Sequence, residues 1–331
     1  MHVEAGRLAQ LRALTLAPRA FLKLAVVSAA SLYLIVITGS LVRLTGSGLG
    51  CESWPGCEEG SFFPASDVHG AIEFGNRAVG IVPIALSAVT WFAARRTVGL
   101  PGWTLRLAAA VALGTLAQAP LGLVTITSGL HPLLVMSHFL LALVVLGGAV
   151  VVAIEAWGAA AGHADLSLPT ELRRLGLVVA AACLVLVVSG AFTTAAGPHP
   201  GDSSEVERLG TLEDMLWVHV RVTALFGCAF LLALGYLAAR RDRWPRLFHA
   251  ALGLLGLVVA QMAVGELQYR LELPWGIVAV HVALAAAVWA ATVALVAALW
   301  RTPAAFAARD TSSRRRSGAL SRGRLTNARN G

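Results

Sequence analysis

The sequence predicts an all-α polytopic membrane protein with eight transmembrane helices, arranged as two duplicated four-helix bundles. Of the 331 residues, 57% are hydrophobic and only 13% are charged, whereas soluble domains carry roughly a quarter charged residues. Eight apolar stretches are each long enough to cross about 30 Å of hydrocarbon. Polar residues also recur at one offset in the two halves of the chain. Composition, span length and repeat therefore indicate the same architecture.

Short polar loops separate the predicted spans. The spans are Phe21–Leu41, Gly70–Ala93, Leu105–Thr125, Leu133–Ala153, Leu175–Thr194, Met215–Ala238, Leu247–Leu267 and Trp275–Leu299. They divide the chain into a cytoplasmic N-terminal segment (1–20), an N-terminal four-helix bundle (21–157), a cytoplasmic linker (158–174), a C-terminal four-helix bundle (175–300) and a basic, disordered cytoplasmic tail (301–331).

The basic residues predict the orientation. They fall in the N-terminal segment, in every second loop and in the tail: Arg7, Arg12, Arg19, Lys23, Arg95, Arg96, Arg106, Arg173, Arg174, Arg240, Arg241, Arg243, Arg246, Arg301, Arg309 and Arg314–Arg316. The positive-inside rule makes this side cytoplasmic, so we expect a multi-pass protein of the plasma membrane with both termini in the cytoplasm. Because the basic runs are short and lie between apolar spans, the net charge of +8 does not indicate nucleic-acid binding.

The two halves share a pattern of polar residues. A shift of 143 residues places Gln118 on Gln261, Gly122 on Gly265 and His138 on His281. The same shift places Asn76 on His219. A parallel duplication is implied, because each half has an even number of spans.

The repeated positions predict a haem site in the C-terminal bundle. Asn76, His138, His219 and His281 each fall one or two turns below the outer start of an even-numbered span, hence at similar depth. Two inward histidines from facing helices commonly hold a haem iron through both axial positions. The alternative is that each histidine caps a neighbouring span by hydrogen bonding. Arg221 suits a haem propionate, and a lipid phosphate equally well.

The N-terminal bundle carries different chemistry at the same positions. His69, Glu73 and Asn76 share one helix face, and Arg77 follows directly. An amide is a poor iron ligand, so a haem here would be held by His138 alone, with its other face open or served by His69. An open position beside a carboxylate suits oxygen activation or proton delivery. The alternative is that these polar groups are solvated among lipid headgroups and only anchor the helix.

Cys51 and Cys57 lie in the first outer loop, on the side where disulfides persist. A structural staple and a thiol–disulfide redox role both fit them. Cys183 and Cys228 lie in apolar spans and are interpreted as small core residues.

Taken together, these residues resemble the haem A synthase family, over about Phe21 to Trp300. The similarity is carried by V-R-L-T-G-S-G-L-G-C-E-S-W-P-G-C at 42–57, I-E-F-G-N-R at 72–77, Gln118 with L-G-L-V-T at 121–125, H-P-L-L-V-M-S-H at 131–138, and the histidines at 219 and 281. The resemblance implies an eight-helix protein of two four-helix bundles. It also implies an oxidoreductase that converts the C8 methyl group of haem O to a formyl group, giving haem A for cytochrome oxidase.

The resemblance also implies residue roles. His219 and His281 would hold a haem b cofactor, with Arg221 beside it, and Cys51 and Cys57 would form a disulfide linked to activity. The substrate haem would bind in the N-terminal bundle against His138, Asn76, Arg77 and His69, with Glu73 as the catalytic carboxylate. Iron would thus be ligated by the histidines at 138, 219 and 281.

Two departures from the family pattern stand out. Many relatives place a histidine where this chain has Asn76, which puts paired-histidine ligation of the substrate haem in doubt. The loop A-A-G-P-H-P-G-D-S-S at 195–204 lacks the second cysteine pair that some members carry.

The functional hypothesis is therefore that a haem held by His219 and His281 relays electrons to haem O at His138, where Glu73, with Asn76 and His69, positions water or protons. Expected partners are haem O, the lipid bilayer, a haem O synthase and cytochrome oxidase assembly factors, and a homo-oligomer is compatible with the sequence. The first rival is a non-catalytic di-haem electron carrier, which would hold two unmodified haems. The second is a transporter, which would place its polar residues near the bilayer midplane.

Overall fold

The computed structural model describes residues 15–202 and 206–307, and the named elements within them are all helical. Eight of the helices are long and apolar enough to cross a membrane, which confirms the predicted fold class. They are α2 (Pro18–Leu44), α3 (Val68–Ala94), α4 (Gly102–Thr127), α5 (Pro132–Ala161), α6 (Thr170–Ala196), α7 (Leu212–Ala238), α8 (Pro245–Arg270) and α9 (Trp275–Trp300), followed by the short 3₁₀ helix η1 (Ala304–Phe306).

Several helices begin at residues suited to a helix start. Pro18, Pro132 and Pro245 occupy the first turns of α2, α5 and α8, where the missing N–H has no intrahelical partner to lose. Asp67 caps α3, since its carboxylate accepts a hydrogen bond from the Gly70 N–H at 2.8 Å. Thr211 caps α7 in the same way. Such polar caps extend the helices a few residues beyond the apolar spans.

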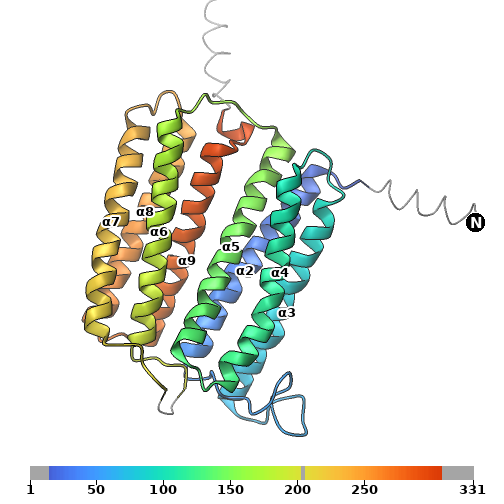
Figure 1. The fold of residues 1–331 in the computed structure, drawn as a ribbon, viewed down its shortest axis with the longest axis vertical. Helices are drawn as coiled ribbons and strands as arrows, with labels where there is room; N and C mark the ends of the chain where they lie inside the picture. The colour runs from blue at the N-terminus through green and yellow to red at the C-terminus, as the bar shows by residue number, and fades with distance from the viewer. Residues whose placement is uncertain (1–14, 203–205, 308–331) are drawn as a thin grey trace, which may run out of the picture.

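The helices form two adjacent groups of four (Figure 1). In the first group α2 packs on α3 and α5, and α4 packs on the same two helices; in the second, α6 packs on α7 and α9, and α8 packs on α9. We call the end with loops 45–67, 128–131, 197–211 and 271–274 the disulfide end. The opposite end, where residues 15–17 and 301–307 lie, is the terminal end.

The two groups meet through α2, α5 and α9. Trp289 of α9 lies against Gly147 of α5, where a Cβ would come within 3.2 Å of the indole, and its Nε1–H donates to the Leu143 carbonyl at 2.7 Å. The Tyr33 hydroxyl of α2 donates to the Ala283 carbonyl of α9 at 3.1 Å. A buried aromatic ring with a satisfied polar atom fixes this interface.

A buried ion pair links the groups again at the terminal end. Glu155 of α5 is 1% exposed and accepts two hydrogen bonds from Arg301, at 2.9 and 2.7 Å. These bonds raise the pKa of the Arg301 guanidinium above its usual value. His163, for which the sequence suggested no partner, lies 3.3 Å from the same carboxylate.

The packed part of the chain continues past the predicted start of the tail. Residues 301–307 contact the first group, and the Phe306 ring lies 5.4 Å from the Trp157 ring. The predicted tail beyond residue 307, and the N-terminal segment up to residue 14, lie outside the described residues. One core prediction is wrong: Cys183 is buried, but Cys228 is exposed, because α7 presents that face outward.

Candidate functional site

A cavity of about 540 Å³ lies among the helices of the first group. Four of the predicted site residues line it: Glu73, Asn76, Arg77 and His138. At the disulfide end its wall also includes Arg43 and Arg208, and towards the middle of the helices it is apolar, with Leu32, Val36, Ile84 and Val145. The volume is within the usual range for small-molecule sites, roughly 300–1,000 Å³. The cavity thus has one charged end and one apolar end.

His138 of α5 is positioned by two residues of α4. The Gln118 side-chain N–H donates to the His138 carbonyl at 3.3 Å. A Cβ on Gly122 would lie 3.5 Å from the imidazole Cε1, so the glycine leaves room for the ring. The Nδ1 atom of His138 is buried and has no hydrogen-bond partner. An orphaned imidazole nitrogen facing a cavity is suited to a ligand.

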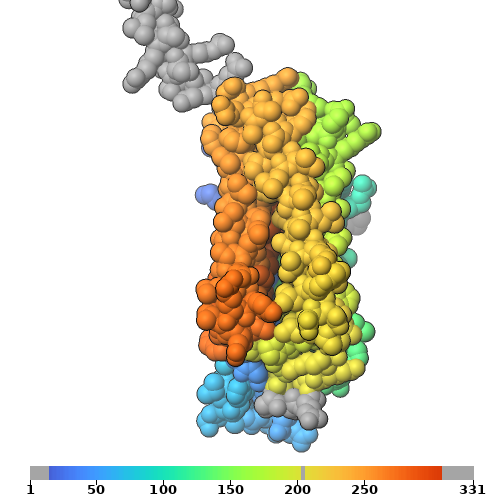
Figure 2. Space-filling model, turned by 90° about the vertical axis from the view of Figure 1, so that its left-hand side faces the viewer, coloured from blue at the N-terminus to red at the C-terminus, as the bar shows by residue number. Residues whose placement is uncertain are grey.

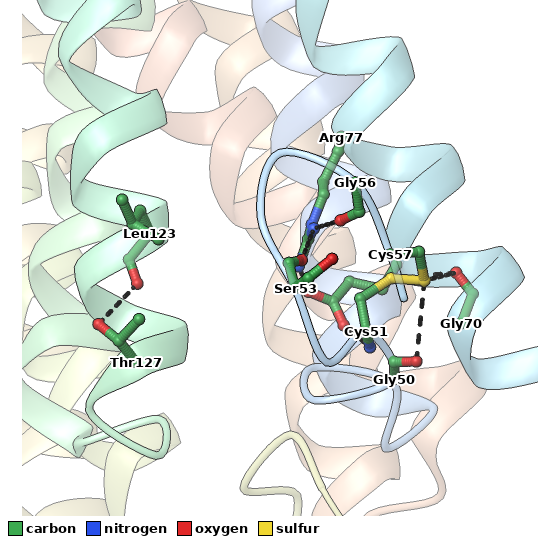
Figure 3. A network of polar contacts seen from close by, with 10 residues as sticks. Gly50, Cys51, Ser53, Gly56, Cys57, Gly70, Arg77, Leu123 and Thr127 are labelled. Atoms are coloured by element: carbon green, nitrogen blue, oxygen red, sulfur yellow. Dashed lines mark hydrogen bonds and ion pairs between the residues drawn. A yellow bond between two sulfur atoms is a disulfide. The ribbon is translucent and has the colours of Figure 1, made fainter. Parts of the chain in front are cut away.

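Glu73 lies at the charged end of the cavity and is 4% exposed. Its Oε1 accepts from Arg77 at 2.5 Å, and its Oε2 accepts from the Cys51 backbone N–H at 2.8 Å. Arg77 also donates to the carbonyls of Ser53 and Gly56, at 2.8 and 2.6 Å (Figure 3). This network holds the carboxylate rigidly and leaves it further acceptor positions, since a carboxylate has about four.

The loop 45–67 is held against the start of α3 by a disulfide and a close glycine contact. Cys51 and Cys57 are joined by a disulfide, and their sulfurs lie 3.7 and 3.8 Å from the Gly70 carbonyl oxygen (Figure 3). A Cβ on Gly50 would approach the His69 carbonyl carbon to 2.5 Å, so only glycine allows this approach. The loop therefore brings the Cys51 N–H to Glu73.

Asn76 faces the cavity, and His69 does not line it. The Asn76 Oδ1 is buried without a partner, and its Nδ2 lies 3.9 Å from where a Cβ on Gly39 would be. His69 is exposed, and its Nδ1 is 2.9 Å from the Ser47 hydroxyl. The helix turns that separate the two residues leave His69 at the loop, outside the cavity wall.

His219 lies at the equivalent position of the second group. The Ser189 hydroxyl donates to the Leu186 carbonyl at 2.8 Å and is 2.9 Å from the His219 Nδ1. Because the hydroxyl hydrogen is already donated, its oxygen accepts from an Nδ1–H, which leaves the lone pair of the imidazole on Nε2. A ring fixed in this way presents Nε2 as a metal ligand. A Cβ on Gly190 would lie 3.1 Å from the His219 Cε1.

His281 of α9 is packed against α8. Its Nε2 is 3.1 Å from the Gln261 side-chain nitrogen, and its Nδ1 is buried without a partner. A Cβ on Gly265 would lie 3.0 Å from its Cε1. His219 is close enough to interact with it electrostatically. Arg221, in contrast, is exposed, and its guanidinium stacks on the Trp217 ring.

Each of the four repeated polar side chains lies against a glycine of a neighbouring helix. We call these the facing glycines: Gly39, Gly122, Gly190 and Gly265. The sequence repeat revealed the second and fourth but missed the first and third, because Gly39 and Gly190 are 151 residues apart, not 143. The loop 45–67 has 23 residues and the loop 197–211 has 15, which accounts for the difference of eight. A separate alignment of α2 with α6 would have found them.

A groove runs between α7 and α8 in the second group (Figure 2). The two helices pack on each other far less than α6 does on α7. Two imidazoles directed into one helix group from α7 and α9, one with an orphaned buried nitrogen, are suited to the axial positions of a haem iron.

Comparisons with known proteins place the chain in a family. The family model COX15-CtaA, described as a cytochrome oxidase assembly protein, matches residues 22–293. The chain is similar to the heme A synthase of Shewanella oneidensis, at 26% identity over 298 residues covering 75% of this chain and 87% of the relative. The heme A synthase of Bacillus licheniformis is 33% identical over 126 residues, which are 37% of this chain and 40% of the relative.

A third relative carries a different name. A protoheme IX farnesyltransferase of Thermus thermophilus is 31% identical over 289 residues, covering 77% of this chain and only 44% of the relative. The chain therefore spans less than half the length of two of these three relatives.

Proposed function

The chain belongs to the COX15-CtaA family of cytochrome oxidase assembly proteins, and we propose that it is a membrane oxidoreductase of haem A synthesis, which converts the C8 methyl group of haem O to a formyl group. Two successive hydroxylations of the methyl carbon give a gem-diol, which loses water to become the aldehyde. The observation that carries the proposal is the cavity of the first group, in which an unpartnered imidazole nitrogen and a buried carboxylate line the same space.

In this proposal His138 is the axial ligand of the substrate iron. Its backbone is held by Gln118, and Gly122 leaves space for its ring. Asn76 offers an unpartnered amide oxygen to the same cavity. Because an amide binds iron poorly, we assign Asn76 to hydrogen bonding of a water or of the hydroxylated methyl, and not to ligation.

Glu73 is the proposed catalytic carboxylate. It accepts the protons that leave the methyl carbon and its hydroxylated products, and it orients water beside that carbon. Arg77 and the Cys51 N–H fix its position, so the disulfide-bonded loop acts as a support for the carboxylate. In this role the disulfide is structural.

We assign a haem b cofactor to His219 and His281. When bound, this haem supplies one-electron transfer. Ser189 orients the His219 ring, and Gln261 and Gly265 contact His281. Arg221 is exposed on the opposite side of α7 and is better suited to lipid phosphates.

The same proposal includes the membrane and the partners. The described arginines of the loops 95–101, 162–169 and 239–244 gather at the terminal end, which we assign to the cytoplasmic side of the plasma membrane. We propose a haem O synthase as a partner, because a segment similar to this chain forms part of a longer protein named protoheme IX farnesyltransferase. Cytochrome oxidase assembly factors are the proposed recipients of the product.

The test is mass analysis of haems extracted from membranes that contain the protein together with a source of haem O. We expect haem A, or its hydroxylated precursor, only in membranes that contain the protein. Unchanged haem O beside tightly bound haem b would instead support a non-catalytic electron carrier and would contradict the proposal.

A further inference from the structure

Two arginines at the charged end of the cavity come from different halves of the chain. Arg43 lies in the last turn of α2, and Arg208 lies in the loop between α6 and α7. Both line the cavity of the first group, and they are close enough to repel each other electrostatically. Among the described residues, neither forms an ion pair with a carboxylate. Two neighbouring cations beside a cavity favour an anionic ligand.

The other charged groups at this end already have partners. Arg77 is bonded to Glu73 and to two loop carbonyls, so its guanidinium is largely occupied. Glu207 also lines the cavity, but its carboxylate lies 3.6 Å from the His131 imidazole. Arg43 donates to the Thr194 carbonyl at 2.6 Å, which uses one of the five N–H groups of a guanidinium. Arg208 donates to the Pro198 carbonyl at 3.3 Å.

The loop of the second half is fitted closely onto the first. The Gly48 N–H donates to the Gly201 carbonyl at 2.6 Å. Gly201 has a φ of 115°, and a Cβ there would come within 3.0 Å of the Leu130 side chain and 3.6 Å of Arg43. Glycine is therefore required for this loop to reach the mouth of the cavity. Partial burial at this place lowers the pKa of the Arg208 guanidinium below its usual range.

We propose that Arg43 and Arg208 bind the propionate carboxylates of the substrate haem, so that the second half of the chain completes the substrate site of the first. This inference rests on the proposed function. Propionates are the anionic groups of haem O, and guanidinium groups bind carboxylates strongly. The apolar end of the cavity, with Leu32, Val36 and Val145, then receives the isoprenoid side chain.

The anchoring would decide which methyl group reacts. The C8 methyl is attached to a pyrrole ring that also carries a propionate. Propionates bound at the charged end would therefore bring this methyl to the same end of the cavity as Glu73. The two ends of the cavity, one cationic and one apolar, fix the in-plane orientation and the face of an asymmetric haem. Arg43 and Arg208 are thus positioning residues.

The test compares haem O with its propionate dimethyl ester, titrated into the purified holoprotein and followed by Soret absorbance. We expect the wild type to bind the free acid at least ~10-fold more tightly than the ester. Arg43→Gln and Arg208→Gln should each bring this ratio towards one. Arg270→Gln, which removes an exposed charge at the same end of the molecule, should keep the wild-type ratio.

Equal binding of acid and ester by the wild type, or an unchanged ratio in both arginine variants, would overturn the inference. Arg208 is exposed in a loop, so Arg208→Gln remains informative if Arg43→Gln does not fold. The titration is independent of turnover: discrimination against the ester without any haem A production would refute the proposed function and leave the propionate site standing.

Discussion

The two helix groups have the same plan and differ at one ligand position. In the second, His219 and His281 both face the interior, each against a glycine. In the first, His138 is retained, but the position equivalent to His219 is Asn76. The first group also has the longer loop, the disulfide and the buried Glu73. One group therefore has the features of a permanent haem site, and the other those of a reactive one.

The comparison shows how a duplicated scaffold acquires two functions. The glycine and glutamine supports are kept: Gln118 contacts His138, and Gln261 contacts His281. Two changes distinguish the first site, namely the loss of one imidazole and the addition of a carboxylate held by the loop 45–67. Each change can be reversed or removed experimentally.

The largest effect is expected from removing the carboxylate of the first group. Glu73→Gln should lower the ratio of haem A to haem O in extracted membranes by ~100-fold or more, because the general base is lost. The amide can still accept from the Cys51 N–H, so the loop should stay in place. Haem b content, measured as pyridine haemochrome, should be unchanged, because that haem belongs to the other group.

Glu266→Gln is the matched control, since Glu266 is exposed and paired only with Arg270 among the described residues. A Glu73→Gln protein that produced haem A at the wild-type level would remove the carboxylate from the mechanism and with it the main difference between the two groups.

Removing a ligand from the second group should give the reverse pattern. His219→Ala or His281→Ala should reduce bound haem b by ~10-fold or more and abolish the low-spin spectrum of the purified protein. His249→Ala, at the exposed terminal end of α8, serves as the control. Full haem b content in both ligand variants would mean that the cofactor lies elsewhere.

Exchanging the differing residue should make the two groups alike. Asn76→His places an imidazole opposite His138, where the Cβ position of Gly39 is 3.9 Å away and leaves space. In the presence of haem O, we expect low-spin haem to rise from about one to about two per chain. His219→Asn should lower it in return. Absorption and electron paramagnetic resonance spectra measure both changes, and an unchanged Asn76→His spectrum would show that the two positions are not equivalent.

Much of this comparison could be predicted from the sequence. Span length and basic loops gave the eight helices, and the offset of 143 residues related His138 to His281 and Asn76 to His219. The cavity wall supplied by Arg43 and Arg208 could not be predicted, because it joins residues 165 positions apart across two helix groups. Nor could the placement of His69, which depends on how Gly50 lets the loop lie on α3. Contacts between loops follow from packing and leave no periodic pattern.

The facing glycines give the smallest and most graded effects. A Cβ would meet the imidazole Cε1 at 3.0 Å for Gly265, 3.1 Å for Gly190 and 3.5 Å for Gly122, and the Asn76 Nδ2 at 3.9 Å for Gly39. A ring that is fixed by iron cannot move aside, so the first two alanine variants should lose haem b by roughly two- to five-fold. Gly122→Ala and Gly39→Ala should leave haem b unchanged.

Gly253→Ala and Gly256→Ala on α8 provide the baseline, since a Cβ at either position meets no atom within 4 Å. These two variants should retain haem and stabilise the helix by about 0.5–1 kcal/mol, because alanine restricts the unfolded chain more than glycine does. Haem content and thermal unfolding of all six variants test the order. If Gly39→Ala lost as much haem b as Gly265→Ala, then space for a ligand ring would not be what the repeated glycines provide, and their recurrence would reflect helix packing alone.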